Sequence, residues 1–551
     1  MASTRPVPRA TPVATCVTDV EIGRLLAPLD GLGAYGAVRA VARLGGVPVA
    51  GVQLPVRDGR VGVEALVDAL AGGHAAELTR YLLRRWLARA ADVGAPAWDA
   101  IAGGDVAPLA ALPDPPDPPL PAVTVAVCTR DRPDDLARCL TALAALDYPE
   151  YQVLVVDNAP RTDATERLVR DQFGGMRYVR EPRPGLDWAR NRAIVEATGE
   201  VLAFTDDDVV VDPGWLRALG RVFGASPAVM AVTGMIEPAE LETRAQVDFE
   251  AYCGFGHGWA RRWTYQPRRA GHAEYRHHSG GALGTGANMA YRRALFDTLG
   301  GFDPALDVGT VTQGGGDIEM FFRVVQEGQL LVYAPEAFVR HRHRRGYDEL
   351  RRQLGTWGSG YHAFLRRSRR AYPEEHRAFD RLAWWWWGEY VVPGILLGSI
   401  GRRPAIATLR RHELFGTLRG LRSYDRAARR ARDLLARYPD EPTVLPRPSA
   451  ARGAAPDLER RATRTVSIDA PVATPLEDVG EVATVQLLVT AHGRPVAEAV
   501  AVPECGRVSV AQLHDVIAAA LTRQLLTDAS SAEAATRSLA GWLGGSGGAA
   551  S

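Results

Sequence analysis

The sequence contains no lysine, so all 65 basic residues among its 551 are arginine. Alanine and glycine are abundant, a composition typical of coding in a GC-rich genome. Such a bias produces some arginine clusters by itself, and these clusters are therefore weak evidence for function. The formal net charge of +1 gives no indication that the chain binds nucleic acid.

Cysteine is scarce, and its spacing excludes a disulfide framework. The chain has an odd number of cysteines with no CxxC pair: Cys16, Cys128, Cys139, Cys253 and Cys505. This pattern favours a reduced, cytoplasmic setting. The first 15 residues lack the charged and then apolar pattern of a signal peptide, so we do not expect secretion.

Long apolar runs are also missing, because no stretch supplies the roughly 20 apolar residues that span a bilayer. The nearest candidate, 382–400, is interrupted by Glu389 and Pro393. Ten arginines and only two acidic residues follow between 402 and 432. Aromatic and arginine-rich helices are typical of contact with the inner surface of a plasma membrane. A tryptophan-rich helix packed on a neighbouring domain or subunit is the alternative.

The most informative segment is residues 200–216, where a short apolar strand ends in three consecutive aspartates. Side chains alternate along a strand, so Asp206 and Asp208 share one face and Asp207 points to the other. Paired carboxylates suit Mg²⁺ or Mn²⁺, which completes its shell with water and substrate phosphates. A solvent-facing acidic turn is the alternative.

Two more apolar, β-branched runs lie upstream, at 123–127 and 153–156. Each is followed by a polar turn and a helix-period stretch, which predicts βαβ units and a mainly parallel sheet. Ligands of such sheets bind beyond the carboxyl ends of the strands. Thr129, Asp157 and the three aspartates lie at such ends, so we expect them to line one edge of the sheet.

Five blocks occur in a fixed order between residues 123 and 345: VTVAVCTRDRPDDLARCL, YQVLVVDNAPRTDAT, PGLDWARNRAIVEATGEVLAFTDDD, GALGTGANMAYRRALFDTLGGFD and GGGDIEMFFRVVQEG. Together they resemble glycosyltransferase family 2, in an actinobacterial-type member with extra terminal modules. The resemblance implies an α/β fold with a GT-A nucleotide-diphospho-sugar core, in which a mixed, mostly parallel sheet lies between helices.

The resemblance also implies a metal site and substrate contacts. Asp206 and Asp208 are the ends of its DxD motif, and His341 is a further ligand of Mn²⁺ or Mg²⁺, with His343 a less favoured choice. Asp157 matches the carboxylate at the nucleobase, and residues 284–288 match the loop below the sugar and acceptor. The implied substrate-binding residues are Thr129, Arg130, Asp157, Arg190, Asn191, Asp207, Gly284, Thr285, Gly286, Asn288 and Glu319.

Asp317 matches the catalytic base of the family. The family commonly has Glu directly before this base, whereas this chain has Gly316 there and Glu319 two residues after it. That shift leaves open how the local charge tunes the base. An alternative interpretation is that Asp317 is the N-cap of the helix that follows three glycines.

These features predict a metal-dependent enzyme that moves a sugar, with inversion, from a nucleoside diphosphate sugar to an acceptor hydroxyl on a glycan, a lipid-linked molecule or a natural product. A nucleotidyltransferase is a rival, although CTRDRPDD lacks the glycines of its expected loop. A non-catalytic, nucleotide-binding scaffold is the second rival.

The chain ends carry a repeat, because residues 38–71 align without gaps on 485–518. Each copy is predicted to form a hairpin and a helix, with Asp68 and Asp515 on exposed helix faces. Such small units must pack on something: each other, a second copy in a homo-oligomer, or a partner.

The predicted domains are an N-terminal α+β module (1–112), a Pro-rich linker (113–121), the GT-A domain (122–370), a basic helical extension (371–440), a linker (441–464), a C-terminal α+β module (465–530) and a flexible tail (531–551).

Overall fold

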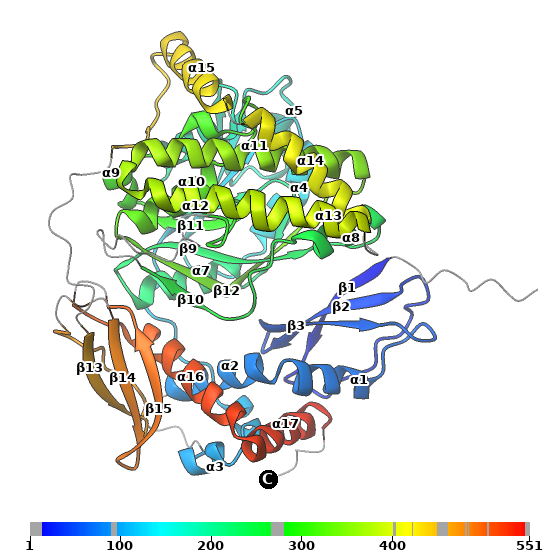
Figure 1. The fold of residues 1–551 in the computed structure, drawn as a ribbon, viewed down its shortest axis with the longest axis vertical. Coiled ribbons are helices and arrows are strands. Elements are labelled where there is room, and N and C mark those ends of the chain that lie inside the picture. The colour runs from blue at the N-terminus through cyan, green and yellow to red at the C-terminus, as the bar shows by residue number, and fades with distance from the viewer. Residues whose placement is uncertain are drawn as a thin grey trace, which may run out of the picture.

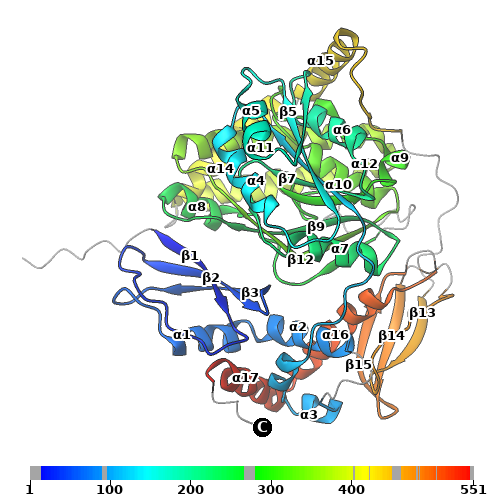
Figure 2. The same ribbon diagram turned by 180° about the vertical axis from the view of Figure 1, so that it is seen from behind.

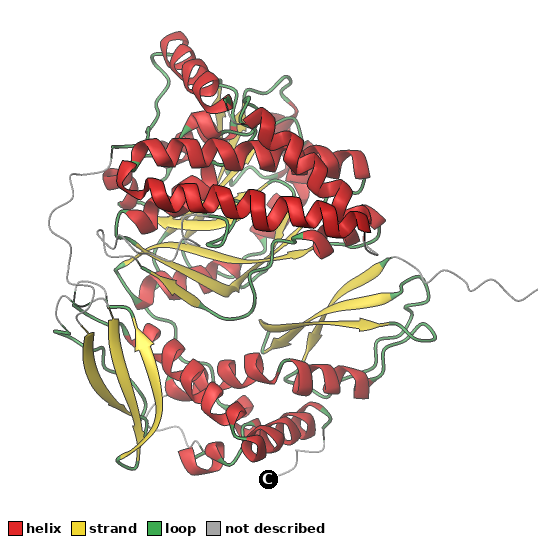
Figure 3. Cartoon of the chain, in the orientation of Figure 1, coloured by secondary structure: helices red, strands yellow, loops and turns green. Residues whose placement is uncertain are grey.

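The computed structural model describes residues 14–89, 96–265, 280–400, 404–420, 422–448, 461–479, 482, 484–503 and 506–545. The central part of the chain forms a sheet enclosed by helices. Both ends of the chain come together beside it, where the N-terminal and C-terminal sheets flank a shared layer of helices (Figures 1 and 2). Figure 3 shows the same arrangement by secondary structure.

The central sheet is mixed and has nine strands in the order β10-β12-β9-β11-β7-β4-β5-β6, with β8 paired to β12. Strands β4, β5, β6 and β7 are parallel, and β11 runs antiparallel to β7. The sheet confirms the predicted α/β architecture. Its strands are β4 (Val123–Thr129), β5 (Tyr151–Asn158), β6 (Arg177–Glu181), β7 (Val201–Asp206), β8 (Val209–Val211), β9 (Val229–Pro238), β10 (Arg262–Thr264), β11 (Asn288–Arg292) and β12 (Leu330–His341).

Helices cover both faces of this sheet because its inner strands are apolar on both sides. Helices α4 and α7 pack with one face, in a core that contains Leu140 and Trp215. Helices α6, α9 and α10 pack with the other face, around Ala193 and Phe321. The helices are α4 (Pro133–Ala144), α5 (Ala164–Gln172), α6 (Leu186–Glu196), α7 (Trp215–Ala225), α8 (Arg244–Tyr252), α9 (Leu295–Leu299) and α10 (Gly316–Gln326).

A layer of further helices covers the central domain (Figure 1). Helices α11 and α14 approach so closely that a Cβ on Gly358 would lie 2.1 Å from the Glu413 carbonyl oxygen. In the predicted membrane segment, Trp386 is buried while Trp384 is 73% exposed, so the expected membrane contact stays a prediction. The helices are α11 (Tyr347–Ala371), α12 (His376–Trp385), α13 (Val392–Ile400), α14 (Pro404–Gly420) and α15 (Ser423–Arg437).

Among the described residues, no helix combines the length and the apolar character needed to cross a bilayer.

The two terminal sheets have the same strand order and pairing, which supports the repeat seen in the sequence. In each, the first pair of strands is parallel and the second is antiparallel. Equivalent isolated bridges join Leu29 to Val61 and Leu476 to Val508. The parallel first strand was not predicted. The strands are β1 (Thr15–Glu21), β2 (Ala37–Leu44), β3 (Val47–Pro55), β13 (Arg461–Ser467), β14 (Thr484–Ala491) and β15 (Arg494–Ala501).

One apolar core joins the two copies, so they pair within a single chain. Helix α2 packs on α16, and Leu83, Trp86 and Leu521 are buried together in this core. The expected flexible tail is wrong for residues 531–543, which belong to helix α17. The module helices are α1 (Val63–Asp68), α2 (Ala75–Leu87), α3 (Trp98–Ala102), α16 (Val510–Thr527) and α17 (Ala529–Leu543).

Polar contacts attach the joined modules to the central domain. The expectation of an exposed Asp515 is wrong, because its carboxylate is 7% exposed and accepts a hydrogen bond of 2.8 Å from Trp263. Asp68 is exposed as predicted. The Pro-rich linker also contacts the domain, since Asp117 pairs with Arg217 and Arg221 of α7.

We expect Leu521→Ala to lower the free energy of unfolding by about 2–5 kcal/mol, the usual cost of a cavity at a fully buried leucine. Because the core is shared, amide hydrogen exchange should also accelerate in α2, more than 400 residues away. Val500→Ala on β15 is the control, because Val500 is 59% exposed. Unchanged exchange in α2 would show that the two copies are independent.

We expect the stability of the helical layer to fall as the pH rises toward neutral. Burial raises the pKa of Glu413 to about 7, against the hydrogen bond from Tyr252 and the charge of Arg410. The folded state therefore binds more protons than the unfolded state between about pH 4.3 and 7. Glu413→Gln should remove this loss, so that its stability relative to the native chain increases from pH 5 to 8 in urea titrations. Glu389→Gln, at an exposed position, should show no such trend.

Candidate functional site

A cavity of about 520 Å³ lies at the carboxyl ends of β4 and β7. The start of α10, the end of β12 and one face of α11 complete its walls. The sequence had placed Thr129 and the aspartates at this edge. The residues that line it include Cys128, Thr129, Arg130, Arg132, Asn158, Asp187, Arg190, Asp206, Asp207, Asp208, Phe255, Thr285, Gly286, Gln313, Gly314, Gly315, Gly316, Asp317, His341, Arg344, Gln353, Thr356 and Trp357.

Asp206, Asp208 and His341 form a group that could hold a metal ion, with one ligand atom from each within 4.8 Å of the others. The Asp208 Oδ1 atom lies 3.3 Å from His341 Nε2, and these two side chains are 7% and 8% exposed. Two carboxylates and an imidazole are donors that suit a divalent cation such as Mn²⁺. The residues present therefore fit the metal that the sequence predicted.

Charge within this group is divided unevenly. Burial and repulsion from Asp208 raise the pKa of Asp206. Burial would also raise the pKa of Asp208, but the nearby His341, Arg344 and Arg132 outweigh it and lower that pKa. The cavity thus keeps Asp208 ionised beside a carboxyl group that is harder to ionise, and a cation between them would relieve the repulsion.

Asp207 is held apart from the metal group, as predicted, although Asp207 and Asp208 lie in the turn after β7 and not in the strand itself. Its carboxylate accepts hydrogen bonds from Thr129 Oγ1 at 2.7 Å and from Arg132 Nη1 at 3.1 Å. Burial, with repulsion from Asp208, raises the pKa of Asp207 to about 6. Thr129 is therefore engaged with a neighbouring side chain at the floor of the cavity.

Asp317 lies in the first turn of α10 and faces the cavity. Its Oδ2 atom accepts a hydrogen bond from the Gly286 backbone N–H at 2.8 Å, and Oδ1 accepts one from Ile318 N–H at 2.9 Å. The interpretation of Asp317 as the N-cap is wrong, because Gly315 is the N-cap residue, with φ +106°. Two backbone donors instead fix the orientation of its carboxylate.

Asp187 occupies the space beside the glycine that precedes Asp317. A Cβ on Gly316 would lie 1.9 Å from Asp187 Oδ2, so no larger residue fits there without moving Asp187. The Oδ1 atom of Asp187 accepts a hydrogen bond of 2.9 Å from Arg190. Burial raises the pKa of Asp187 to about 7, against the attraction of Arg190. The carboxylate beside Gly316 and Asp317 is therefore that of Asp187 on α6, and not that of Glu319.

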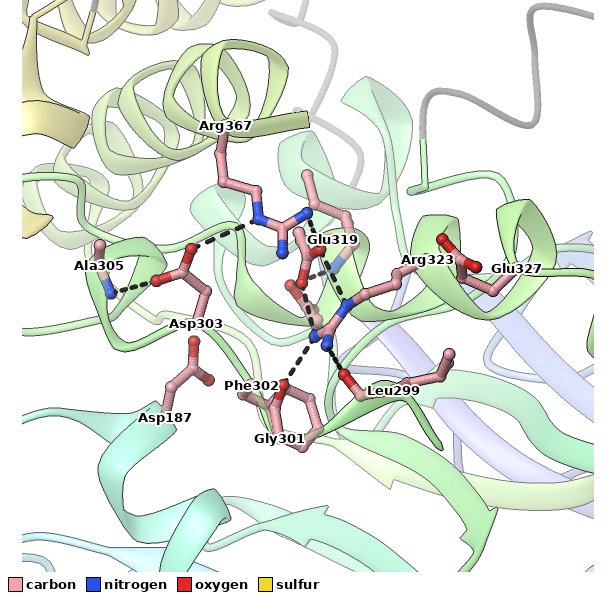
Figure 4. A network of polar contacts seen from close by, with 12 residues as sticks. Asp187, Leu299, Gly301, Phe302, Asp303, Ala305, Glu319, Arg323, Glu327 and Arg367 are labelled. Atoms are coloured by element: carbon pink, nitrogen blue, oxygen red, sulfur yellow. Dashed lines mark hydrogen bonds and ion pairs between the residues drawn. The ribbon is translucent and has the colours of Figure 1, made fainter. Parts of the chain in front are cut away.

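Glu319 does not contribute to the cavity, so its predicted substrate contact is wrong. The side chain is fully buried and its carboxylate accepts hydrogen bonds from Arg323 and pairs with Arg367 at 2.7 Å (Figure 4). Arg323 in turn donates to the carbonyl oxygens of Leu299 and Gly301. This network joins α10, α11 and the loop after α9.

Four other predicted contacts lie outside the cavity lining. Asn191 bonds through its amide to the N–H and C=O of Phe302. Asn288 donates to the Met235 and Ala337 carbonyls. A Cβ on Gly284 would lie 2.5 Å from Thr233. Asp157 is fully buried, and burial raises its pKa to about 6 despite the hydrogen bond from Tyr178. Substrate roles for all four residues stay predictions.

The structure adds residues that the sequence did not single out. Arg132 and Arg344 lie 3.4 Å and 3.5 Å from Asp208 Oδ2 and bring positive charge to the cavity. The arginine-rich composition concealed both. Asp187 could have been found from its i,i+3 spacing to Arg190 on a predicted helix. No local signal indicated Trp357 of α11, which packs with Phe255 at the cavity wall.

Residues 124–300 match the family model described as "Glycosyl transferase family 2". The chain is similar to the succinoglycan biosynthesis protein ExoM of Rhizobium meliloti, with 28% identity over 39% of this chain and 65% of that protein. It is also similar to the glucosyl-dolichyl phosphate glucuronosyltransferase of Haloferax volcanii, with 22% identity over 40% of this chain and 69% of that protein. The matched parts are thus about two thirds of those relatives.

Among solved structures, a mannosyltransferase from Pyrobaculum calidifontis in complex with GDP-Man and Mn²⁺ aligns with 69% of this chain and 99% of its own. The sequence identity is 20% and the TM-score is 0.34. The family match spans β4 to the end of α9 and, with the mixed sheet, agrees with the predicted GT-A core.

We expect Gly316→Ala to lower the free energy of unfolding by about 1–3 kcal/mol, because the added methyl group overpacks against Asp187. Adding Asp187→Ala should recover most of this loss, since the two positions are in contact and their effects are not additive. Urea denaturation of the four chains of this cycle measures the coupling. Gly62→Ala, where a Cβ would meet nothing within 4 Å, is the control. Additive losses would contradict the packing.

Proposed function

We propose that this chain, whose central domain belongs to glycosyl transferase family 2, transfers a sugar from a nucleoside diphosphate sugar to an acceptor hydroxyl with inversion at the anomeric carbon. The observation that carries the proposal is the convergence of Asp206, Asp208 and His341 in the same cavity as Asp317. A cavity of about 520 Å³ is also within the usual size of a small-molecule site, roughly 300–1,000 Å³.

Asp206, Asp208 and His341 would hold Mn²⁺ or Mg²⁺ in this proposal. When bound, the cation neutralises the negative charge that develops on the departing nucleoside diphosphate. Arg132 and Arg344 add positive charge at the same end of the cavity, where they would contact the phosphates once Asp208 binds the cation.

Asp317 would accept the proton of the attacking hydroxyl. The hydrogen bonds from Gly286 and Ile318 hold one carboxylate geometry, and each oxygen keeps a lone pair for the proton. A single base and a single displaced diphosphate suit one in-line displacement, which inverts the anomeric centre. Arg190 and Asp187 border the same space, beside Gly286 and Gly316, and would define the room left for the acceptor.

We expect Asp317→Asn to reduce turnover by about 10²–10⁴, the usual contribution of a general base, with donor affinity changed little. The measurement is release of nucleoside diphosphate from a panel of sugar nucleotides with Mn²⁺, in parallel with donor binding by calorimetry. Asp208→Asn should instead abolish the Mn²⁺-dependent part of donor binding. Asp163→Asn is the control, because that carboxylate is 64% exposed.

Two results would contradict the proposal. Binding of nucleotides without turnover of any donor would favour a non-catalytic scaffold. Full turnover by Asp317→Asn would place the base elsewhere.

A further inference from the structure

A chain of polar contacts leads from the N-terminal module into the candidate metal group. It begins at Arg39 on β2, whose Nη1 lies 2.9 Å from Glu250 Oε2. Glu250 Oε1 lies 2.7 Å from His343 Nε2, and His343 Nδ1 lies 3.2 Å from His341 Nδ1. The chain ends where His341 Nε2 meets Asp208 at 3.3 Å. Every link is largely shielded from solvent.

The direction of these hydrogen bonds follows from the groups involved. Arg39 only donates, and the Glu250 carboxylate only accepts, so His343 Nε2 must carry a hydrogen to bond to it. A neutral His343 then has a lone pair on Nδ1, which accepts from Nδ1–H of His341. A neutral His341 then keeps a free lone pair on Nε2, beside Asp208. A cation bound between these two atoms, which lie 3.3 Å apart, would be held by both acceptors.

Packing and ion pairing hold each link in place. The ring of Phe255 lies 5.1 Å from His341, and that of Phe249 lies 4.7 Å from His343, both edge to face. Arg39 also makes hydrogen bonds of 2.6 and 3.0 Å to both carboxylate oxygens of Glu237. These two bonds fix the plane of the guanidinium group and hold Nη1 in position for its contact with Glu250.

We propose that Glu250, held by Arg39, is a positioning residue for the metal site and acts through His343 to keep His341 in the tautomer with a free Nε2 lone pair. This inference rests on the proposed function, in that His341 is taken as a metal ligand. Through Arg39, the N-terminal module, which lies outside the residues matched to the family, would hold the Glu250 carboxylate in place. Such outer contacts typically change metal affinity by about 10–100-fold.

The decisive variant is Glu250→Gln. Because Arg39 only donates, the amide oxygen must face Arg39 and the NH₂ group must face His343, whose Nε2 then has to accept. This reverses both imidazoles and puts the hydrogen of His341 on Nε2, where it blocks the cation. We expect Mn²⁺ affinity to fall about 10–100-fold. In Arg39→Ala/Glu250→Gln the amide is free to turn its oxygen toward His343, so affinity should largely recover.

The test uses the full chain, with free Mn²⁺ counted by EPR in the absence of nucleotide, and with the tautomer of His341 measured by ¹⁵N-histidine NMR with Mg²⁺. Arg43→Ala is the matched control. Arg43 also joins the N-terminal module to the central domain, through Asp212 at 2.7 Å, without contacting this chain of residues. It should therefore leave Mn²⁺ affinity unchanged, and circular dichroism checks that every variant is folded.

The possible outcomes separate the two proposals. If Asp208→Asn leaves Mn²⁺ binding unchanged, the metal site itself is wrong. If Asp208→Asn abolishes binding but Glu250→Gln matches the native chain, the metal site stands and the positioning role of Glu250 is overturned. Equal losses in Glu250→Gln and in the double variant would also overturn it, because only the tautomer argument predicts recovery on removing Arg39.

Discussion

Repulsion among three carboxylates that leave β7 in consecutive positions is the constraint on which the rest of the site depends. Asp207 lies in the turn between β7 and β8 and faces one side, where Thr129 and Arg132 hold it. Asp206 and Asp208 remain together on the other side, and His341 approaches from the end of β12. The antiparallel pairing of β8 with β12 brings that histidine there, since His341 lies opposite Val209 in the register. The fold thus places an arginine, a threonine hydroxyl and a histidine around three carboxylates that the sequence keeps close together.

A second acidic group shows that packing, and not order in the sequence, decides which carboxylate lies beside Asp317. The position before Asp317 is a glycine, and the space that a side chain would fill there belongs to the carboxylate of Asp187 from α6. Glu319, the nearer acid in the sequence, turns into the protein interior toward Arg323 and Arg367. Distance along the chain was therefore a poor guide to which acid accompanies the candidate base.

Much of the fold and part of the site could be predicted because their signals are local. The β-branched runs of β4 and β5, the aspartates after β7 and the order of the motifs predicted the sheet and four of the side chains that meet at its edge: Asp206, Asp208, Asp317 and His341. Their roles in metal binding and catalysis stay predictions. Arg132 and Arg344 could not be distinguished from the arginine bias. The burial of Glu319 and Asp515 depends on partners from distant elements. Helix α17 lies mostly in the segment predicted as a flexible tail, although its alanines are good helix formers.

The shared core of the terminal modules also has a consequence for biosynthesis. Helix α2 leaves the ribosome early, but α16, which completes its packing, follows only after roughly 400 further residues. At ordinary translation rates of 5–20 residues per second, that delay is about 20–80 s. Throughout it, the face of α2 that packs on α16 lacks that partner in the nascent chain, while the central domain can already fold. The first module to be synthesised is therefore among the last to be completed, and nascent chains of this protein are natural clients for chaperones that shield apolar surface.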